Sequence, residues 1–252
     1  MKKKRTAIIT GAGQGIGLAI AEKLAAQSIN LILNDLEEDL ILDACSRISH
    51  IHGMKVLAVP GDSSNTEVID SLIETAISNF GSVDILVANA GITLFGSFLE
   101  YSREDFMEVM RVNQAGTFFL AQAAAKVMKD QPSGGAMLFT SSVTGHQSHA
   151  NLGAYAMSKA AVEMLAKNLV LELAPFNIRI NTVAPGATLT NRTAMDPDYE
   201  STWSRITPLG RPANVQDIAN AAAFLVSEEA KHITGQTLII DGGWTCVSPP
   251  PY

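Results

Sequence analysis

The chain has 252 residues, 47% of them hydrophobic, which is enough for one large buried core. Its formal net charge is −7 and no cluster of Lys and Arg follows the first five residues, so a nucleic acid is not an expected partner. The basic start imitates a signal peptide, but the apolar run behind it breaks at Gly11, and no stretch is long enough to cross a membrane. Two cysteines far apart in the chain, Cys45 and Cys246, complete the features that predict a reduced, cytoplasmic protein.

Short strand-like runs alternate with amphipathic helical patterns along the chain. Strands are expected near 6–10, 30–34, 56–60, 84–88, 136–141, 178–184 and 237–241. Helices are expected near 15–27, 37–50, 65–80, 103–129, 153–173 and 214–226. Alternation of this kind predicts an α/β fold, a Rossmann-like doubly wound parallel sheet of about seven strands with helices on both faces. We expect one catalytic domain over residues 1–252.

Two segments do not fit the alternation. The irregular stretch 187–213 is longer than a compact domain usually tolerates, which predicts a substrate loop inserted in the domain. Its apolar residues, which could close over a substrate, are Met195, Tyr199, Trp203 and Ile206. The proline-rich tail 248–252 cannot form a helix or an inner strand, so it either lies disordered or packs on a neighbouring subunit.

A glycine-rich turn over residues 11–17, Gly-Ala-Gly-Gln-Gly-Ile-Gly, joins the first strand to the first helix. Glycines let the backbone turn tightly and approach a pyrophosphate. The helix that follows offers free N–H groups and the positive end of its dipole to the phosphates. The position between strand and helix favours a dinucleotide site over a turn without a ligand.

Asp35 ends the second strand, 18 residues after Gly17. A carboxylate at this point can accept hydrogen bonds from both ribose hydroxyls of an adenosine, and it would repel a 2′-phosphate. Gln14 in the turn and the acidic run after Leu36 provide no cation to bind such a phosphate. The pattern therefore predicts NAD rather than NADP, although Asp35 is also a good N-cap for the next helix.

Tyr155 and Lys159 are four residues apart in a predicted helix, so their side chains lie on one helix face. A free tyrosine ionises near pH ~10 and is a poor proton carrier at neutral pH. A fixed ammonium beside a tyrosine favours the phenolate, which makes the pair a candidate acid and base.

These features and several further motifs resemble the short-chain dehydrogenase/reductase (SDR) family over nearly the whole chain. The matches, in family order, are Thr10-Gly11 and Gly15-Ile16-Gly17 in a TGxxxGxG turn, Asp62 after the third strand, Ala88-Asn89-Ala90-Gly91 for NNAG, Asn113, Ser142, Tyr155 and Lys159 in YxxxK, and Pro185-Gly186 with Thr188 and Thr190. The chain departs from the pattern at Ala88, which replaces the first Asn of NNAG.

The resemblance implies the roles of these residues. The catalytic tetrad would be Asn113, Ser142, Tyr155 and Lys159. The cofactor would be held by Gly11, Gly13, Gln14, Gly15, Ile16, Gly17, Asp35, Leu36, Asp62, Ser63, Asn89, Ala90, Gly91, Tyr155, Lys159, Pro185, Gly186, Thr188 and Thr190, with Asp62 at the adenine. No metal is expected, because the five histidines show no ligand spacing with acidic or cysteine partners.

The implied reaction is the interconversion of a secondary alcohol and a ketone with NAD(H), on a polyol, a sugar or another small hydroxy compound. A 3-oxoacyl-[acyl-carrier-protein] reductase is the alternative, opposed by Asp35, by Phe176 where such reductases carry a docking Arg, and by the net charge of −7. A non-catalytic dinucleotide-binding redox sensor is a further alternative, opposed by the complete tetrad. His146 and His149 either line the substrate pocket or lie on a surface loop.

Small residues are frequent on the helices expected at 103–129 and 153–173. The resemblance implies that these helices pair across a dimer axis and that dimers form a homotetramer. Close packing of the helices on their own sheet would also favour alanine, but Phe118, Phe119 and Met164 add apolar bulk that a monomer would have to expose. The second interface is expected to use the last strand and the chain from Trp244 onward.

Overall fold

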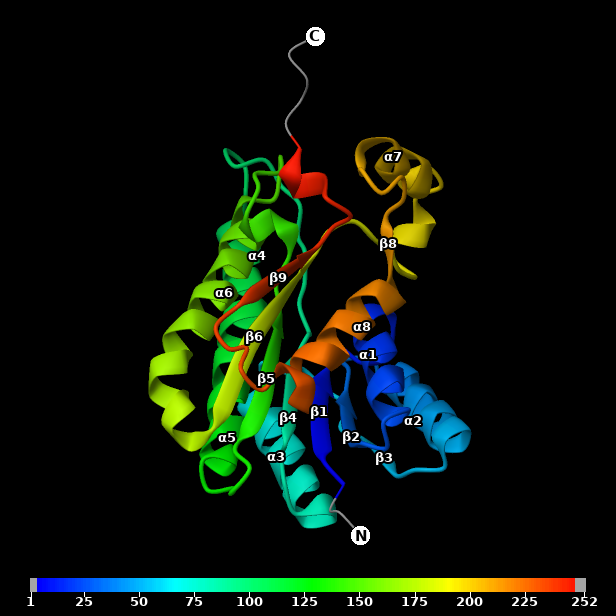
Figure 1. Ribbon diagram of the computed structural model, residues 1–252. Helices are drawn as coiled ribbons and strands as arrows, with labels where there is room; N and C mark the ends of the chain where they lie inside the picture. The colour runs from blue at the N-terminus through cyan, green and yellow to red at the C-terminus, as the bar shows by residue number, and fades with distance from the viewer. Residues whose placement is uncertain (1–3, 248–252) are drawn as a thin grey trace.

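A computed structural model describes residues 4–247 of the chain. Seven parallel strands form one sheet in the order β3-β2-β1-β4-β5-β6-β9 (Figure 1). Their bounds are β1 Thr6–Thr10, β2 Asn30–Asn34, β3 Val56–Ala58, β4 Ile85–Ala88, β5 Gly135–Thr140, β6 Ile178–Pro185 and β9 Thr237–Ile240. The expected seven-stranded Rossmann-like sheet is confirmed, and each strand lies within two residues of its expected bounds.

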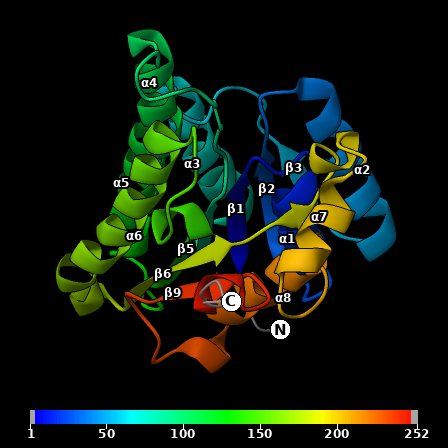
Figure 2. The ribbon, with the colours of Figure 1, turned by 90° about the horizontal axis from the view of Figure 1, so that it is seen from above.

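Helices cover both faces of the sheet, as Figure 2 shows from above. One face carries α1 Gly15–Ala25, α2 Glu38–His52 and α8 Val215–Leu225. The other face carries α3 Thr66–Phe80, α5 Thr117–Met128 and α6 Gly153–Leu173, with α4 Arg103–Met110 beside α6. Alternate strand residues face the two layers: Ile9 packs under α1 and α8, whereas its neighbour Ile8 packs under α3 and α5. Both faces are therefore buried, which explains the continuous apolar runs of the strands.

The parallel arrangement brings the carboxyl ends of all the strands to one edge. In-register pairing of β1 with β2, from Thr6 opposite Asn30 to Thr10 opposite Asn34, places the glycine turn beside Asp35. The chain runs outward in opposite directions from β1 and β4, which are adjacent in the sheet. In open α/β sheets, the crevice at such a switch point is where ligands bind.

The helix expected over 103–129 is interrupted. Between α4 and α5 the backbone forms a π-helical turn, η1 Arg111–Gly116, which contains Asn113. The Asn113 amide bonds to Ile92 and Ser158 outside its own helix. Turns of this kind concentrate at functional sites.

The segment 187–213 was expected to be irregular, but the structure shows regular elements in it. It contains the helix α7 Tyr199–Ile206, and β7 Thr188–Leu189 pairs with β8 Ala213–Asn214. Acidic Glu200 near the start of α7 and basic Arg205 near its end suit the helix dipole. Short 3₁₀ turns complete the described chain: η2 Val143–Gly145, η3 Ala174–Phe176, η4 Thr193–Met195, η5 Glu228–Ala230 and η6 Trp244–Cys246. The tail 248–252 lies outside the described residues, so both expectations for it stay predictions.

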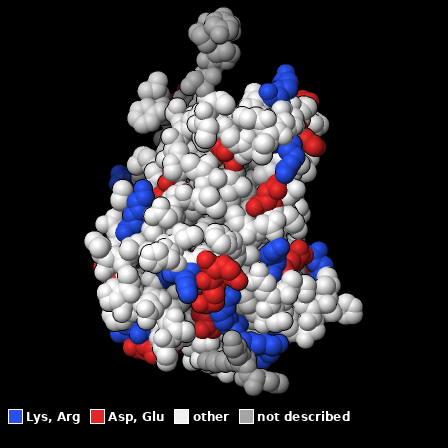
Figure 3. Space-filling model, viewed as in Figure 1, with Lys and Arg blue, Asp and Glu red and all other residues white. Residues whose placement is uncertain are grey.

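The described surface carries charges of both signs. On the face in Figure 3, acidic and basic side chains are interspersed in the lower half, and the basic side chains do not gather into one patch. Among residues 4–247, no helix has the length and apolar character needed to cross a membrane. Cys45 and Cys246 are both free, and burial raises the pKa of the Cys45 thiol to about 12.

Candidate active site

The glycine turn and Asp35 contact each other directly. The Gly13 N–H donates to Asp35 Oδ2 at 2.9 Å, and the Glu37 N–H reaches Oδ1 at 3.3 Å. A Cβ on Gly13 would lie 2.9 Å from that same Oδ2, so a side chain has no room there. Gly17 is still more constrained, because a Cβ would lie 2.0 Å from the Gly11 carbonyl oxygen. The turn is thus shaped by its glycines to bring the backbone against the carboxylate.

Asn89 joins three strand ends at the centre of the site. Its Nδ2 donates to the carbonyl oxygens of Thr10 and Gly11, both at 3.1 Å, and its Oδ1 accepts from Thr140 Oγ1 at 3.1 Å. Thr10 Oγ1 in turn accepts from the N–H groups of Asn89 and Ala90. These bonds fix the ends of β1, β4 and β5 relative to one another.

Tyr155 and Lys159 lie in the first two turns of α6, as expected. Lys159 is 5% exposed, its Nζ donates to the Thr140 carbonyl at 2.8 Å, and it lies 5.5 Å from the centre of the Tyr155 ring. Ser142 follows β5, and its Oγ accepts from the Thr144 N–H at 3.3 Å. Tyr155, Lys159 and Ser142 all line one cleft at the carboxyl edge of the sheet.

Asn113 is 1% exposed, and its amide bonds to Ile92 and Ser158 and not to Ser142, Tyr155 or Lys159. Its Oδ1 accepts from the Ile92 N–H at 2.8 Å, and its Nδ2 donates to the Ile92 carbonyl and to Ser158 Oγ, both at 3.0 Å. Gly91 separates it from Lys159: a Cβ there would lie 3.1 Å from Asn113 Oδ1 and 3.3 Å from Lys159 Nζ. Asn113 therefore fixes the backbone at Ile92, near Lys159, and does not line the cleft.

The cleft has a volume of about 670 Å³ and brings together most of the expected residues. The expected site residues that line it are Gln14, Gly15, Ile16, Asn89, Gly91, Ser142, Tyr155, Lys159, Pro185, Gly186, Thr188 and Thr190. Those that do not line it are Gly11, Gly13, Gly17, Asp35, Leu36, Asp62, Ser63, Ala90 and Asn113. Asp35 nevertheless adjoins the cleft through its bond to the glycine turn, whereas Leu36 is 67% exposed beyond it.

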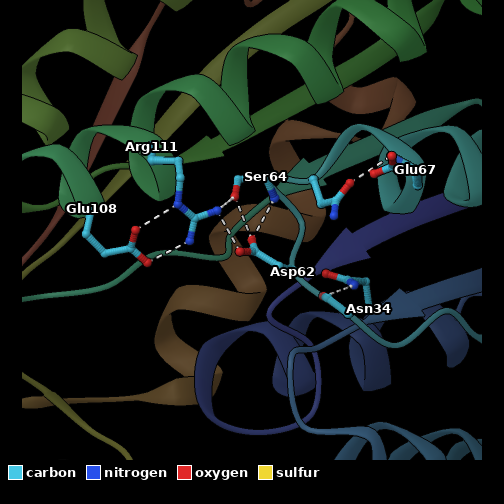
Figure 4. A network of polar contacts seen from close by, with 8 residues as sticks. Asn34, Asp62, Ser64, Glu67, Glu108 and Arg111 are labelled. Carbon is cyan, nitrogen blue, oxygen red and sulfur yellow. Dashed lines mark hydrogen bonds and ion pairs between the residues drawn. The ribbon is translucent and has the colours of Figure 1, made fainter.

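Asp62 lies in the middle of the loop 59–65 between β3 and α3, within the polar network of Figure 4. Its Oδ1 accepts from the Ser64 N–H at 2.9 Å and from Ser64 Oγ at 2.7 Å, and its Oδ2 lies 2.6 Å from Arg111 Nη1. Burial opposes ionisation of this carboxyl, but the bonds from Ser64 and Arg111 hold its pKa below the ordinary value. Asp62 is therefore kept as a carboxylate.

An aromatic wall closes the cleft on the side of the 187–213 segment. Trp203 lies 6.0 Å from Tyr199 and 5.3 Å from Trp244, measured between ring centroids, and all three line the cleft. Met195 and Ile206, which were also expected to close over a substrate, do not line it. Trp244 could not be assigned to the site from the sequence, because nothing in its local pattern connects it to the 187–213 segment.

The two loop histidines differ. His149 lines the cleft, but His146 does not. The Nε2 of His146 lies 2.9 Å from Glu163 Oε1. Glu163 is 6% exposed and also accepts from Ser141 Oγ at 2.6 Å, so it joins the loop of Ser142 to α6. The bond to Ser141 was not predicted, although Glu163 is four residues after Lys159 and therefore lies on the same helix face. Among the residues described, no three His, Cys, Asp or Glu side chains form a group able to hold a metal ion.

Comparisons with known proteins agree with this geometry. The family model described as enoyl-(acyl carrier protein) reductase matches residues 11–245. The chain is 35% identical to 3β-hydroxysteroid dehydrogenase 1 of Eggerthella lenta, over 96% of this chain and 94% of the relative. It is 35% identical to L-rhamnose 1-dehydrogenase (NAD(P)(+)) of Azotobacter vinelandii, over 95% of this chain and 96% of the relative. A short-chain type dehydrogenase/reductase from Mycobacterium marinum has the same fold, with a TM-score of 0.91, 33% identity and 96% of each chain covered.

The chain therefore belongs to the short-chain dehydrogenase/reductase family. Its fold, its order of motifs and its relatives define an oxidoreductase that acts on CH–OH groups with a nicotinamide dinucleotide.

Proposed function

We propose that the protein is an NAD(H)-dependent dehydrogenase that interconverts a secondary alcohol and a ketone on a polyol, a sugar or another small hydroxy compound. The observation that carries this proposal is the convergence of Ser142, Tyr155 and Lys159 on the cleft that the glycine turn also lines. We place the protein in the cytoplasm, because both cysteines are free and no described helix has the character of a membrane span. We treat it as a single catalytic domain, because seven of its strands form one sheet.

The chemistry assigned to each side chain follows from its position. Tyr155 takes the hydroxyl proton in oxidation and returns it in reduction, while Ser142 donates a hydrogen bond to the same substrate oxygen. The ammonium of Lys159, anchored to the Thr140 carbonyl, lies 5.5 Å from the centre of the Tyr155 ring and so places a positive charge beside the proton carrier. Bound NAD supplies the hydride acceptor, and NADH the donor. Asn113 holds Gly91 and Ile92 in place behind Lys159.

The preference for NAD rests on Asp35. A carboxylate offers about four acceptor positions, and two of those on Asp35 are occupied by the N–H groups of Gly13 and Glu37. Two positions remain for the ribose hydroxyls of the adenosine, and the negative charge opposes a 2′-phosphate. The name of the A. vinelandii relative covers both cofactors, so Asp35, and not the likeness, supports our choice.

The substrate class rests on the cleft and on two relatives. Aromatic side chains, Trp203 and Trp244, supply a face for an apolar ring or carbon chain. Thr93 and His149 add groups that can form hydrogen bonds with hydroxyls. The relatives named above act on a sugar and on a steroid by their names, and both kinds of compound carry hydroxyl groups on ring carbons.

The alternative of a 3-oxoacyl-[acyl-carrier-protein] reductase shares the catalytic residues. It finds no support at Phe176, which is 43% exposed where a docking cation would be expected, or in the acidic net charge. A redox sensor without turnover would not require the buried Lys159 beside Tyr155.

We further propose a homotetramer. A groove of about 800 Å³ lies over α4, α5 and α6 and is lined by Phe118, Phe119 and Met164, which are 43%, 52% and 55% exposed. A second copy of this face would cover them. The edge strand β9 exposes Leu238 and Ile239 at 40% and 38%, which supports it as the second interface. Light scattering should give a tetramer, and Met164→Glu should yield smaller species; a monomeric wild type at micromolar concentration would contradict this assembly.

One screen tests the proposed reaction. Polyols, sugars, secondary alcohols and hydroxysteroids are each incubated with NAD and with NADP, and reduced nicotinamide is followed by absorbance. We expect turnover of a small hydroxy compound with NAD. Turnover confined to 3-oxoacyl thioesters with NADPH would support the alternative, and binding of NAD without turnover of any compound would support the sensor.

A further inference from the structure

Arg111 connects the catalytic side of the molecule to the loop of Asp62. Its Nε and Nη2 donate to Glu108 Oε2 and Oε1 at 2.7 and 2.6 Å, a two-point clamp within one helix. Its Nη1 lies 2.6 Å from Asp62 Oδ2 and also contacts Ser64 Oγ. Figure 4 shows the guanidinium between the two carboxylates. Planar, two-point recognition of carboxylates fixes the orientation of both partners.

The π-helical turn η1 packs directly on the same loop. A Cβ on Gly116, at the end of η1, would lie 3.2 Å from the Cβ of Ser64 and 3.5 Å from the Ser63 carbonyl oxygen. Asn113, two residues after Arg111, bonds not to the Asp62 loop but to Ile92 and Ser158. One short turn therefore contacts both the Asp62 loop and the residues behind Lys159.

The bonds to Asp62 also decide what it can still bind. Of about four acceptor positions on a carboxylate, two are taken by Ser64 and one by Arg111. One position remains for an external N–H donor, such as the exocyclic amino group of adenine. The side chain is held in place by the three bonds before any ligand arrives, which lowers the entropy that binding must remove.

We propose that Arg111 is a positioning residue for the adenosine half of the dinucleotide, and that it acts through Asp62, the carboxylate that it shares with Ser64. The proposal rests on the proposed function, since it takes the loop of Asp62 as the adenine-binding edge.

The test uses Arg111→Met, which keeps the length of the side chain and removes the charge and its donors. Calorimetry measures the Kd of ADP-ribose, which carries the adenosine, and of nicotinamide mononucleotide, which does not. We expect the Kd of ADP-ribose to rise about fivefold, the scale of a well-formed, partly exposed ion-pair network, with the Kd of the mononucleotide unchanged. Equal changes for both ligands, or no change for either, would overturn the proposal.

Two further variants separate positioning from a general structural role. Arg47→Met removes a comparable Arg–Glu pair, that of Arg47 with Glu22 at 2.9 Å, and should leave both affinities unchanged. Asp62→Asn combined with Arg111→Met completes a double-mutant cycle. Because Arg111 acts through Asp62, its substitution should add almost nothing in the Asp62→Asn background. Full additivity would show that Arg111 does not act through Asp62.

A pH series gives an independent readout. The charged groups that face Asp62 are Arg111 and, beyond it, Glu108, whose charge acts in the opposite sense. Without Arg111 the pKa of Asp62 rises, so the acid loss of ADP-ribose affinity should begin at higher pH than in the wild type. An unchanged acid limb would contradict the proposal. A wild type that binds neither ligand would instead refute the dinucleotide site itself, which keeps the two failures distinguishable.

Discussion

Replacing Asp35 tests the cofactor preference through a single carboxylate. Asp35→Ala removes both acceptor positions left for the ribose hydroxyls and also the partner of the Gly13 N–H, 2.9 Å away. A hydrogen bond to a charged group contributes about 1.5–3 kcal/mol, and part of that is regained from water at this half-buried site. A net loss of about 2–3 kcal/mol corresponds to a fall of about 30- to 150-fold in kcat/KM for NAD.

The same substitution affects NADP in the opposite direction. Removing one negative charge at about 4 Å from a phosphate in a solvated site is worth about 1 kcal/mol, or about fivefold. The ratio of kcat/KM for NAD to that for NADP should therefore fall by about two to three orders of magnitude, mainly through weaker use of NAD.

Asp35→Asn is the matched control for the turn itself. The amide oxygen can still accept from the Gly13 N–H, so the glycine turn and the melting temperature should be retained while the charge is lost. Steady-state kinetics with both cofactors and thermal unfolding of the three proteins decide the matter. A wild type that prefers NADP, or two variants that keep the full NAD preference, would refute the reasoning about Asp35.

Two other predictions follow from the site. Ser142→Ala should lower kcat by about 10²–10³ with the NAD Kd unchanged, because one donor to the reacting oxygen is lost; a fall of less than threefold in single-turnover rates would contradict its role. Glu163→Ala should destabilise the fold by about 1–2 kcal/mol in urea unfolding, because Ser141 Oγ loses its shorter buried bond and keeps only the Lys159 carbonyl as an acceptor at 3.0 Å. Glu163→Gln keeps an acceptor and should lose less; equal losses would argue against this bond.

Much of the architecture could be predicted because it depends on local patterns. The strand positions follow from apolar runs, and the helix-face spacing of Tyr155 and Lys159 anticipates a contact that the structure places at 5.5 Å. The turn at Asn113 could not be predicted, because its amide bonds to Ile92 and Ser158, which only the fold brings near. The contact between Arg111 and Asp62 joins residues 49 positions apart for the same reason.

Some of what was missed did have a signal. The spacing of Glu108 and Arg111 is that of an ion pair on one helix face. Tyr199 and Trp203 are four residues apart, with acidic Glu200 in the first turn and basic Arg205 in the last, a pattern typical of a short helix, and they form one face of α7. The segment 187–213 was expected to be irregular because a helix of only eight residues gives a weak periodic signal among its many polar residues.

In the proposed alcohol–ketone interconversion, Tyr155 carries the proton. Tyr155→Phe keeps the ring beside Lys159 and removes only the hydroxyl. Measured together, the NAD Kd should stay within about twofold of the wild type while turnover of the best substrate falls by about 10³ or more. Retention of most of the turnover in this variant would contradict the account.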